Sequence, residues 1–269
     1  MSQSFVAFDL ETTGLYPIKD KIVEIGAVRF NGDKTIDTFQ SLVNPGISIP
    51  EEVIAIHGIT NEMVRNAPFE KDAVEIFLDF IKSDILLAHN APFDAGFIMA
   101  AVAQYKISVP RNSLVDTCEL AKKFIKGVKN YKLSTLGEYL NIKDTRYHRA
   151  MADAVAGMEV FRAVIRNLPK DTPADSIPFR TGQSLKLDDF VFDNIDLDPD
   201  KLLLKDAVKE GFDVCIEYRN GNGEYSKRQV SPFNLYCFRG KGYLAAFCRQ
   251  AQEPRQFRVD RLVSVSKIG

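Results

Sequence analysis

The spacing of apolar residues changes along the chain, and the order of these changes constrains the fold most strongly. Apolar residues alternate or cluster in three early segments, Phe5–Asp9, Ile22–Phe30 and Thr38–Val43, which predicts three strands in succession. After Phe69 the spacing becomes helical, and helices alternate with short strands at 85–88 and 114–116. The helices are expected at 74–81, 95–105, 119–125, 133–140 and 151–168. Strands followed by strand–helix alternation predict an α/β fold with a mixed sheet.

Charge is distributed unevenly along the 269 residues, although the net charge of the whole chain is only −1. Residues 1–168 hold 19 Lys and Arg against 21 Asp and Glu, residues 169–200 hold 3 against 8, and residues 201–269 hold 13 against 7. We therefore predict three parts: a near-neutral domain at 1–168, an acidic linker at 169–200 and a basic domain at 201–269.

The basic part has the pattern of a small all-β domain. A short helix is expected at 202–209, and the turn Asn220–Gly223 separates two strand patterns. The expected strands are 214–218, 227–230, 234–238, 243–247 and 257–265. Short strands joined by glycine-rich turns predict a small β-barrel.

Acidic residues stand where predicted strands end and helices begin. Asp9 and Glu11 follow the first apolar run, and the period of two places both carboxylates on one face. Asp94 lies in the first turn of one helix, and His148 and Asp153 stand at the start of another. Each feature alone also fits an ordinary structure, such as a polar strand exit or an acid that complements the helix dipole. Their joint occurrence favours a functional site.

These residues resemble the motifs of the DEDDh exonucleases, over residues 4–168. The matching stretches are Asp9-Leu-Glu11-Thr-Thr-Gly14, His89-Asn-Ala-Pro-Phe-Asp94, and His148 to Asp153, with Asn44-Pro-Gly46 and Ile56-His57-Gly-Ile-Thr60 between the first and second motifs. The resemblance implies a ribonuclease H-like exonuclease domain. It also implies that Asp9, Glu11, Asp94 and Asp153 hold two Mg²⁺ or Mn²⁺ ions, and that His148 is the general base.

This chemistry suits phosphodiester hydrolysis. Two hard cations can activate a water on one side of the phosphate and stabilise the leaving oxygen on the other. A histidine near neutrality can take the proton of that water. The resemblance thus implies a metal-dependent 3′→5′ exonuclease that acts on nucleic acid with a free 3′ end and releases nucleoside 5′-monophosphates. Single-stranded DNA is favoured over RNA as the substrate.

Further residues are candidates for holding the terminal nucleotide. Thr12, Thr13 and Leu15 follow the first two metal ligands, where similar enzymes place the 3′ nucleotide. Phe93 is expected to pack on a base or sugar or to belong to the core, while His57 and Asn90 either contact the substrate or stabilise loops. A run of lysines could hold phosphates or form a solvated helix face, namely Lys122, Lys123, Lys126, Lys129 and Lys132.

The C-terminal part resembles the WYL domain, a small Sm/SH3-like β-barrel found on bacterial nucleic-acid regulators. The similar stretches are Val230-Ser-Pro232, Tyr243 to Cys248 and Arg255 to Arg261, although Gly242 stands where that family has its tryptophan. Arg255, Arg258 and Arg261 are expected to contact an anion or a nucleic-acid strand, unless they are paired with neighbouring acids.

Two other functions remain compatible with the sequence. One is a regulatory nucleic-acid-binding protein whose nuclease body is inactive, which the five intact candidate residues disfavour; the other is a proofreading subunit of a polymerase complex. We expect no membrane association, because no apolar run approaches the roughly 20 residues of a span, and no signal peptide. Four scattered cysteines favour a cytoplasmic protein without disulfides. No protein partner is indicated.

Overall fold

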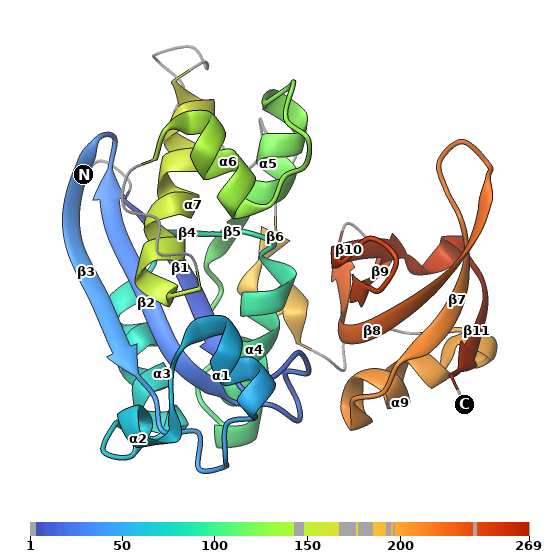
Figure 1. Ribbon diagram of the computed structural model, residues 1–269, viewed down its shortest axis with the longest axis horizontal. Helices are drawn as coiled ribbons and strands as arrows, with labels where there is room; N and C mark the ends of the chain where they lie inside the picture. The colour runs from blue at the N-terminus through green and yellow to red at the C-terminus, as the bar shows by residue number, and fades with distance from the viewer. Residues whose placement is uncertain are drawn as a thin grey trace.

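The computed structural model describes residues 4–142, 148–166, 176, 185–191, 195, 197–238 and 241–268. Its first sheet has six strands in the order β3-β2-β1-β4-β5-β6 (Figure 1). The strands are β1 (Phe5–Thr12), β2 (Ile22–Asn31), β3 (Lys34–Leu42), β4 (Ile85–Ala88), β5 (Ser113–Asp116) and β6 (Leu185–Lys186). β1, β2 and β3 are antiparallel, whereas β4 runs parallel to β1 and to β5. The α/β fold with a mixed sheet is therefore confirmed.

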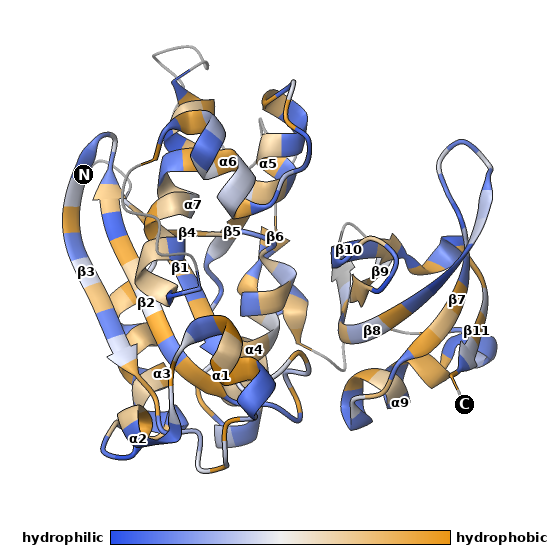
Figure 2. Cartoon of the chain, viewed as in Figure 1, coloured by the Kyte–Doolittle hydropathy of each residue, from blue (hydrophilic) through white to orange (hydrophobic). Residues whose placement is uncertain are grey.

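Helices cover both faces of this sheet. One face of β1 and β2, which includes Phe5 and Phe30, packs on α5, α6 and α7, and the other, with Phe8 and Ile25, packs on α3 and α4. The period of two in β1 explains why successive residues face opposite layers. β1 and β2 are mostly apolar on both faces, while β3 at the edge mixes hydrophilic and hydrophobic residues and is largely exposed (Figure 2). These helices are α3 (Glu70–Ile81), α4 (Pro92–Tyr105), α5 (Thr117–Phe124), α6 (Leu133–Leu140) and α7 (Ala150–Ile165).

Two short helices were not among the predicted elements. α1 (Glu51–His57) and α2 (Asn61–Val64) lie between β3 and α3. α2 is only one turn long and is capped at its start by Thr60, whose hydroxyl accepts a hydrogen bond from the Met63 N–H. Such short helices have too few turns to show a clear helical period, so the sequence pattern did not indicate them.

The second sheet is antiparallel, with strand order β10-β9-β8-β7-β11. Its elements are α9 (Leu203–Glu210), β7 (Val214–Arg219), β8 (Tyr225–Phe238), β9 (Lys241–Cys248), β10 (Glu253–Arg258), the 3₁₀ turn η5 (Val259–Arg261) and β11 (Leu262–Lys267). No pairing joins β10 to β11 within the described residues, so the expected closed Sm/SH3-like barrel is not confirmed.

β8 is one long strand where the sequence predicted two. Its first half pairs with β7 and its second half pairs with β9, and the register shifts between Pro232 and Asn234. Because proline has no N–H to donate, it is tolerated within a sheet at such a bulge. The Ser231-Pro232 step therefore marks a bend of a continuous strand and not its end.

Part of the expected acidic linker is built into the fold. Leu185 and Lys186 add β6 to the edge of the first sheet, and the 3₁₀ turn η2 (Leu187–Phe190) follows. Phe190 is 1% exposed, and its ring lies 4.7 Å from the ring of Tyr236 in β8. Another short 3₁₀ turn, η4 (Pro199–Lys201), precedes α9.

Within the described residues, none of the helices has both the length and the apolar character that a membrane span requires.

Candidate active site

Three carboxylates meet at the end of β1. Asp9 and Glu11 point to the same side of this strand because side chains alternate along it, and Asp153 comes from the first turn of α7. Each of the three offers an oxygen, and these oxygens all lie within 4.8 Å of one another. Residues 144 positions apart in sequence thus form one acidic cluster.

Asp94 approaches the same region from α4, but is held more firmly by the protein. It is 2% exposed, and its Oδ1 accepts a hydrogen bond from the Leu10 N–H at 3.0 Å. Leu10 stands between Asp9 and Glu11, so this bond ties the start of α4 to the strand that carries them.

His148 and Asp153 are joined by the backbone. The Asp153 Oδ2 accepts a hydrogen bond from the His148 N–H at 2.9 Å, and His148 has a positive φ of 66°. The imidazole itself is exposed and lines the same cavity as the carboxylates. The Oδ1 of Asp153 is buried and has no hydrogen-bond partner in the described part of the chain.

A buried ion pair holds the start of α7 against β2. Glu24 is fully buried, and its carboxylate accepts hydrogen bonds from the Arg149 Nη2 at 2.7 Å, the Arg149 Nε at 3.0 Å and the Ala150 N–H at 3.1 Å. It therefore caps α7 from another element, since no local side chain does so. A Cβ at Gly26 would lie 2.3 Å from the Met151 N, so glycine is required for this close approach. Glu24 and Gly26 together set the position of Asp153 and His148.

Burial and mutual repulsion raise the pKa values of the clustered acids. Burial raises the pKa of Glu11 to about 8, with further contributions from Asp153 and Glu24. Burial likewise raises the pKa of Asp153 to about 6, and burial and then the neighbouring carboxylates raise the pKa values of Asp9 and Asp94. In contrast, the Arg149 guanidinium lowers the pKa of Glu24 despite its burial. A cluster of acids that repel one another is suited to a bound cation.

The donor set fits hard divalent metal ions. All the ligand atoms are carboxylate oxygens, which Mg²⁺ and Mn²⁺ prefer, and the buried Oδ1 of Asp153 has no partner in the described residues. The positive charge of a metal would remove the repulsion that raises the pKa values of these acids.

We expect the metal-free protein to lose stability as the pH rises from about 5 to 8. The pKa values of Glu11 and Asp153 are raised in the folded state, so the folded protein binds more protons than the unfolded chain in this range. The stabilisation is complete below the unfolded pKa near 4 and declines by about 1 kcal/mol per pH unit for each such group, until the folded pKa is reached. Thermal unfolding in EDTA at several pH values measures this decline. Saturating Mn²⁺ should flatten it, and a metal-free protein equally stable at pH 5 and 8 would contradict it.

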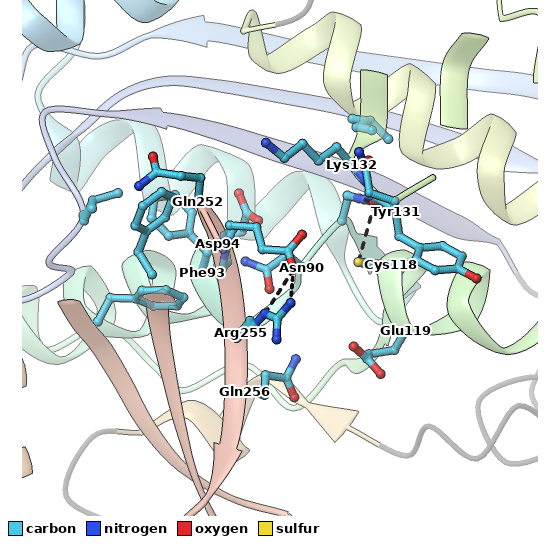
Figure 3. A pocket seen from close by; sticks show the side chains of 18 of the residues that line it. Asn90, Phe93, Asp94, Cys118, Glu119, Tyr131, Lys132, Gln252, Arg255 and Gln256 are labelled. Atoms are coloured by element: carbon cyan, nitrogen blue, oxygen red, sulfur yellow. Dashed lines mark hydrogen bonds and ion pairs between the residues drawn. The ribbon is translucent and has the colours of Figure 1, made fainter. Parts of the chain in front are cut away.

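The acidic cluster opens into a large cleft that both sheets line. The cleft has a volume of about 1350 Å³, and its walls include Asp9, Glu11, Asp94, His148 and Asp153. Figure 3 shows side chains from both parts of the chain around the cleft: Asn90 and Asp94 of the exonuclease part, Arg255 and Gln256 of β10, and Gln252 of the turn before β10. The volume exceeds the 300–1,000 Å³ of pockets for drug-sized ligands, so the cleft has room for several units of a polymer.

The other predicted substrate residues divide into two groups. Leu15, Asn90 and Phe93 line the cleft, and the Asn90 N–H donates to Asp116. Thr12, Thr13 and His57 are buried outside the cleft lining. The Thr12 hydroxyl donates to the Gly14 carbonyl, the Thr13 hydroxyl accepts from the Lys21 N–H, and the His57 Nδ1 accepts from the Ile59 N–H. The structure thus gives Thr12, Thr13 and His57 roles in loop geometry.

Two of the three predicted arginines are paired with acids of their own strand or turn. The Arg255 Nη2 lies 2.8 Å from the Glu253 Oε1, and the Arg258 Nε lies 2.9 Å from the Asp260 Oδ1. Arg261 lines the cleft and forms no ion pair with a carboxylate of the described chain. Arg228, which the sequence analysis did not single out, also lines the cleft without an ion pair to a carboxylate of the described residues. It contacts Ser226 and Cys248 instead. Only the register of β8 places Arg228 on the cleft side, so its sequence context gave no signal.

Further lining residues were also missed. Ile56 of α1 is 58% exposed at the cleft, and its place at the start of the matching stretch Ile56 to Thr60 is the signal that could have indicated it. Tyr218 and Phe257 line the cleft as an edge-on aromatic pair with ring centroids 5.2 Å apart. Of the predicted lysine run, Lys122, Lys129 and Lys132 line the cleft, and Lys122 is paired with Glu119 at 2.6 Å.

The fold and the acidic cleft together define a class of protein, namely the nucleases with a mixed α/β sheet and a carboxylate cluster. The model of the exonuclease family matches residues 6–161, and the chain belongs to this family. The WYL domain model matches residues 201–266. The chain therefore carries a domain of the exonuclease family followed by a region that matches the WYL domain.

Comparison with known proteins agrees with this assignment. PolC-type DNA polymerase III of Caldanaerobacter subterraneus subsp. tengcongensis is 42% identical over 164 residues, which cover 61% of this chain and 12% of that protein. PolC-type DNA polymerase III of Bacillus subtilis is 37% identical over 155 residues, or 57% of this chain and 11% of that one. The chain thus spans only about a tenth of the length of these relatives.

Solved structures show the same fold. The nuclease domain of 3′hExo, a DEDDh family member bound to rAMP, matches with a TM-score of 0.55 at 19% identity over 62% of this chain and 94% of that one. Escherichia coli Exonuclease I in complex with a dT13 oligonucleotide matches with a TM-score of 0.59 at 16% identity over 91% of this chain and 55% of that one. The second match extends beyond the exonuclease region into the WYL domain.

Proposed function

We propose that the protein is a metal-dependent 3′→5′ exonuclease that removes nucleoside 5′-monophosphates from single-stranded DNA. The observation that carries the proposal is the cluster of Asp9, Glu11 and Asp153, whose oxygens lie within 4.8 Å of one another in a cleft that also holds His148. The direction of degradation rests on the resemblance to the DEDDh exonucleases. The preference for single-stranded DNA follows the similarity to Escherichia coli Exonuclease I, which was solved in complex with a dT13 oligonucleotide.

Asp9, Glu11, Asp94 and Asp153 would hold two Mg²⁺ or Mn²⁺ ions. When bound, such ions activate a water and stabilise the charge that develops on the phosphate and the leaving oxygen. The four acids supply negative charge that balances the ions, and their burial limits the competing water.

His148 accepts the proton of the attacking water in this proposal. Its imidazole is exposed to the cleft, while its backbone N–H is fixed on the Asp153 carboxylate at 2.9 Å. The proposed base is thus linked to one of the proposed metal ligands, and the ion pair of Glu24 with Arg149 keeps both in place. General-base catalysis needs the base within hydrogen-bond reach of the proton, and the bond to Asp153 supports this role by keeping His148 next to a proposed metal ligand.

The terminal nucleotide would lie between Leu15, Ile56 and Asn90. These residues come from three different elements and line the cleft around the acidic cluster. An apolar side chain on each side of a base with one polar side chain between them is typical of a nucleotide pocket. Phe93 also lines the cleft, so the proposal includes contact of the substrate with the part of its ring that Phe97 and Phe233 leave uncovered.

A degradation panel tests the proposal. The purified full-length protein is incubated with 5′-labelled single-stranded and double-stranded DNA and RNA of one sequence, in Mg²⁺, Mn²⁺ or EDTA. We expect hydrolysis in both metals, none in EDTA, and faster shortening of single-stranded DNA than of the duplex or the RNA. Equal rates on the blunt duplex and the single strand would refute the substrate preference but not the exonuclease assignment.

The strand beyond the terminal nucleotide is proposed to follow the WYL side of the cleft. Arg228 and Arg261 can neutralise phosphates there, because neither forms an ion pair with a carboxylate of the described residues. The half-buried Tyr218, which packs on the buried Phe257, offers a ring for stacking. The pairing of Arg255 with Glu253 and of Arg258 with Asp260 makes those two arginines weaker candidates than the sequence predicts.

We expect the variant with both Arg228→Gln and Arg261→Gln to bind a 20-nucleotide single strand more weakly. The slope of log Kd against log salt should fall by about one for each phosphate that is no longer neutralised, while hydrolysis of a dinucleotide stays unchanged. The double variant Arg255→Gln and Arg258→Gln is the matched control, with the same change of charge in the same domain. A greater decrease of affinity in the control would assign the strand contact to Arg255 and Arg258.

A second candidate is proofreading in a polymerase complex. The observation in its favour is the 42% identity to a PolC-type DNA polymerase III. Proofreading requires a mispaired 3′ end to be removed faster than a paired one, so hydrolysis of primer–templates with matched and mismatched ends distinguishes this function. The same rate on both would leave single-strand degradation as the function.

A further inference from the structure

The WYL domain shares a hydrophobic core with the exonuclease domain. Phe233 and Tyr236 of β8 belong to the same buried cluster as Phe97 and Ile98 of α4. The ring of Phe93, at the start of α4, lies 5.1 Å from Phe97 and 5.5 Å edge-on from Phe233. The WYL domain also has a core of its own, which includes Val214, Ile216 and Leu244. A merely tethered module would present a polar surface between the domains, whereas here apolar side chains of β8 pack against α4.

Polar contacts tie the WYL domain to the same part of the exonuclease domain. The Tyr16 hydroxyl donates to the Asp213 Oδ1 at 2.9 Å, and the Gln256 Nε2 donates to the Asp116 Oδ2 at 3.3 Å. Asn234 of β8 is 3% exposed, and its Nδ2 donates to the Pro92 carbonyl in the first turn of α4 at 3.4 Å. Tyr16 lies five residues after Glu11 and Pro92 lies two residues before Asp94. The contacts therefore involve the loop after β1 and the first turn of α4, the segments next to the proposed metal ligands Glu11 and Asp94.

Gly96 allows this close contact. A Cβ at this position would lie 2.7 Å from the Asn234 Nδ2 and 3.2 Å from the Pro17 Cγ, and the first distance is shorter than side chains tolerate. Glycine in the interior of a helix costs about 1 kcal/mol relative to alanine, so its presence in α4 has to be offset by packing. Here the packing partner is a side chain of the WYL domain. Asn234, Phe233 and Gly96 thus fix the separation between β8 and α4.

We propose that the WYL domain positions the metal site: its contact with α4 and with the loop after β1 holds Asp94 and Glu11 where the metal ions require them. Phe233 and Gly96 are then positioning residues of the exonuclease reaction, and Asn234 limits how closely β8 approaches α4. Activity depends on this contact even for a substrate too short to touch the arginines of the WYL domain. The inference rests on the proposed function, because it takes Asp94 and Glu11 to be metal ligands.

The test uses the full-length protein with the substitution Gly96→Ala, which inserts one methyl group between the two domains. The substrate is the p-nitrophenyl ester of thymidine 5′-monophosphate, a single nucleotide that cannot span the cleft. We expect kcat to fall by about ten- to a hundred-fold, as small displacements of reacting groups do. The Mn²⁺ concentration for half-maximal activity should rise, while KM changes little. An effect on binding alone would raise KM and leave the metal dependence unchanged.

Two further variants keep the result interpretable. Gly157→Ala is the matched control, since it also adds a methyl group to a helix, in α7, where the nearest atom is the Thr117 Oγ1 at 3.9 Å. We expect its activity and metal dependence to equal those of the unaltered protein. Asn234→Ala in combination with Gly96→Ala removes the clash, so the double variant should recover most of the decrease in kcat caused by Gly96→Ala. Circular dichroism confirms that each variant is folded.

The outcomes separate the two proposals. If Gly96→Ala is as active as Gly157→Ala, or if the double variant is no better than Gly96→Ala, the WYL domain does not position the metal site. If the unaltered protein hydrolyses no substrate in Mn²⁺, the proposed exonuclease function fails instead. Failure of Gly96→Ala to fold, with a folded and active double variant, supports the contact, and the metal dependence of the double variant then decides its role.

Discussion

Replacing Asp9 by asparagine is expected to abolish hydrolysis, with a loss of rate of about 10⁴-fold or more, the scale seen when a central catalytic group is removed. Asp9 stands between Glu11, Asp94 and Asp153, so its carboxylate contributes most to any charge shared between two metal ions. Asparagine keeps the shape of the side chain but not the charge. Rates on a labelled single strand in saturating Mn²⁺ measure the effect.

The same substitution should raise the stability of the metal-free protein. Burial and neighbouring carboxylates raise the pKa of Asp9, so its ionised form opposes folding near neutral pH. We expect the Tm of Asp9→Asn in EDTA at pH 8 to exceed that of the unaltered protein, and the gain from added Mn²⁺ to be smaller. An inactive variant that is also less stable in EDTA would indicate a general disruption of the fold.

Replacing His148 by alanine is expected to reduce the rate by about 10²–10⁴-fold, the range that general-base catalysis contributes. KM and the metal dependence should change little, because His148 is exposed and its tie to Asp153 runs through the backbone N–H, which alanine retains. Single-turnover rates with saturating substrate isolate this step.

Added imidazole provides the control for this assignment. A small base that diffuses into the open cleft should restore part of the rate of His148→Ala, while it has no effect on Asp9→Asn. Full activity of His148→Ala without imidazole would show that His148 has no part in the proton transfer. A loss accompanied by a large change in metal dependence would mean that the substitution disturbs Asp153.

The sequence predicts the acidic cluster well because its members stand at the ends of regular elements. Asp9 and Glu11 share a face of β1 through the period of two, and Asp153 lies in the first turn of α7. In the mixed sheet, the C-terminal end of β1 and the starts of α4 and α7 lie at the same end of the strands. Local pattern and topology therefore suffice to bring Asp9, Glu11 and Asp153 together.

The partners of individual side chains could not be predicted in this way. Thr12 and Thr13 bond to their own loop, and Arg258 bonds to Asp260 two residues away, but only the backbone geometry decides between such bonds and a substrate. The ion pair of Glu24 with Arg149 joins residues 125 positions apart. Such contacts depend on the register of β2 against the start of α7, which the apolar pattern does not specify.

The relation between the two domains was the largest departure from the sequence analysis. Charge separates the chain into a near-neutral and a basic part, which indicated two domains joined by a linker. Charge describes surfaces, however, and not cores, so it could not indicate that Phe233 and Tyr236 pack with α4. Gly96 in the middle of an apolar helix was the one signal of a close approach, because glycine is otherwise unfavourable there.

The central claim is tested most directly by a time course of hydrolysis of a 5′-labelled single-stranded DNA, in Mn²⁺ and in EDTA. The account predicts a ladder of 5′-labelled products that shorten stepwise from the 3′ end, with release of nucleoside 5′-monophosphates, and no products in EDTA or with Asp9→Asn. Release of the label as a mononucleotide at the earliest times, internal fragments without a ladder, or hydrolysis that persists in EDTA would contradict it.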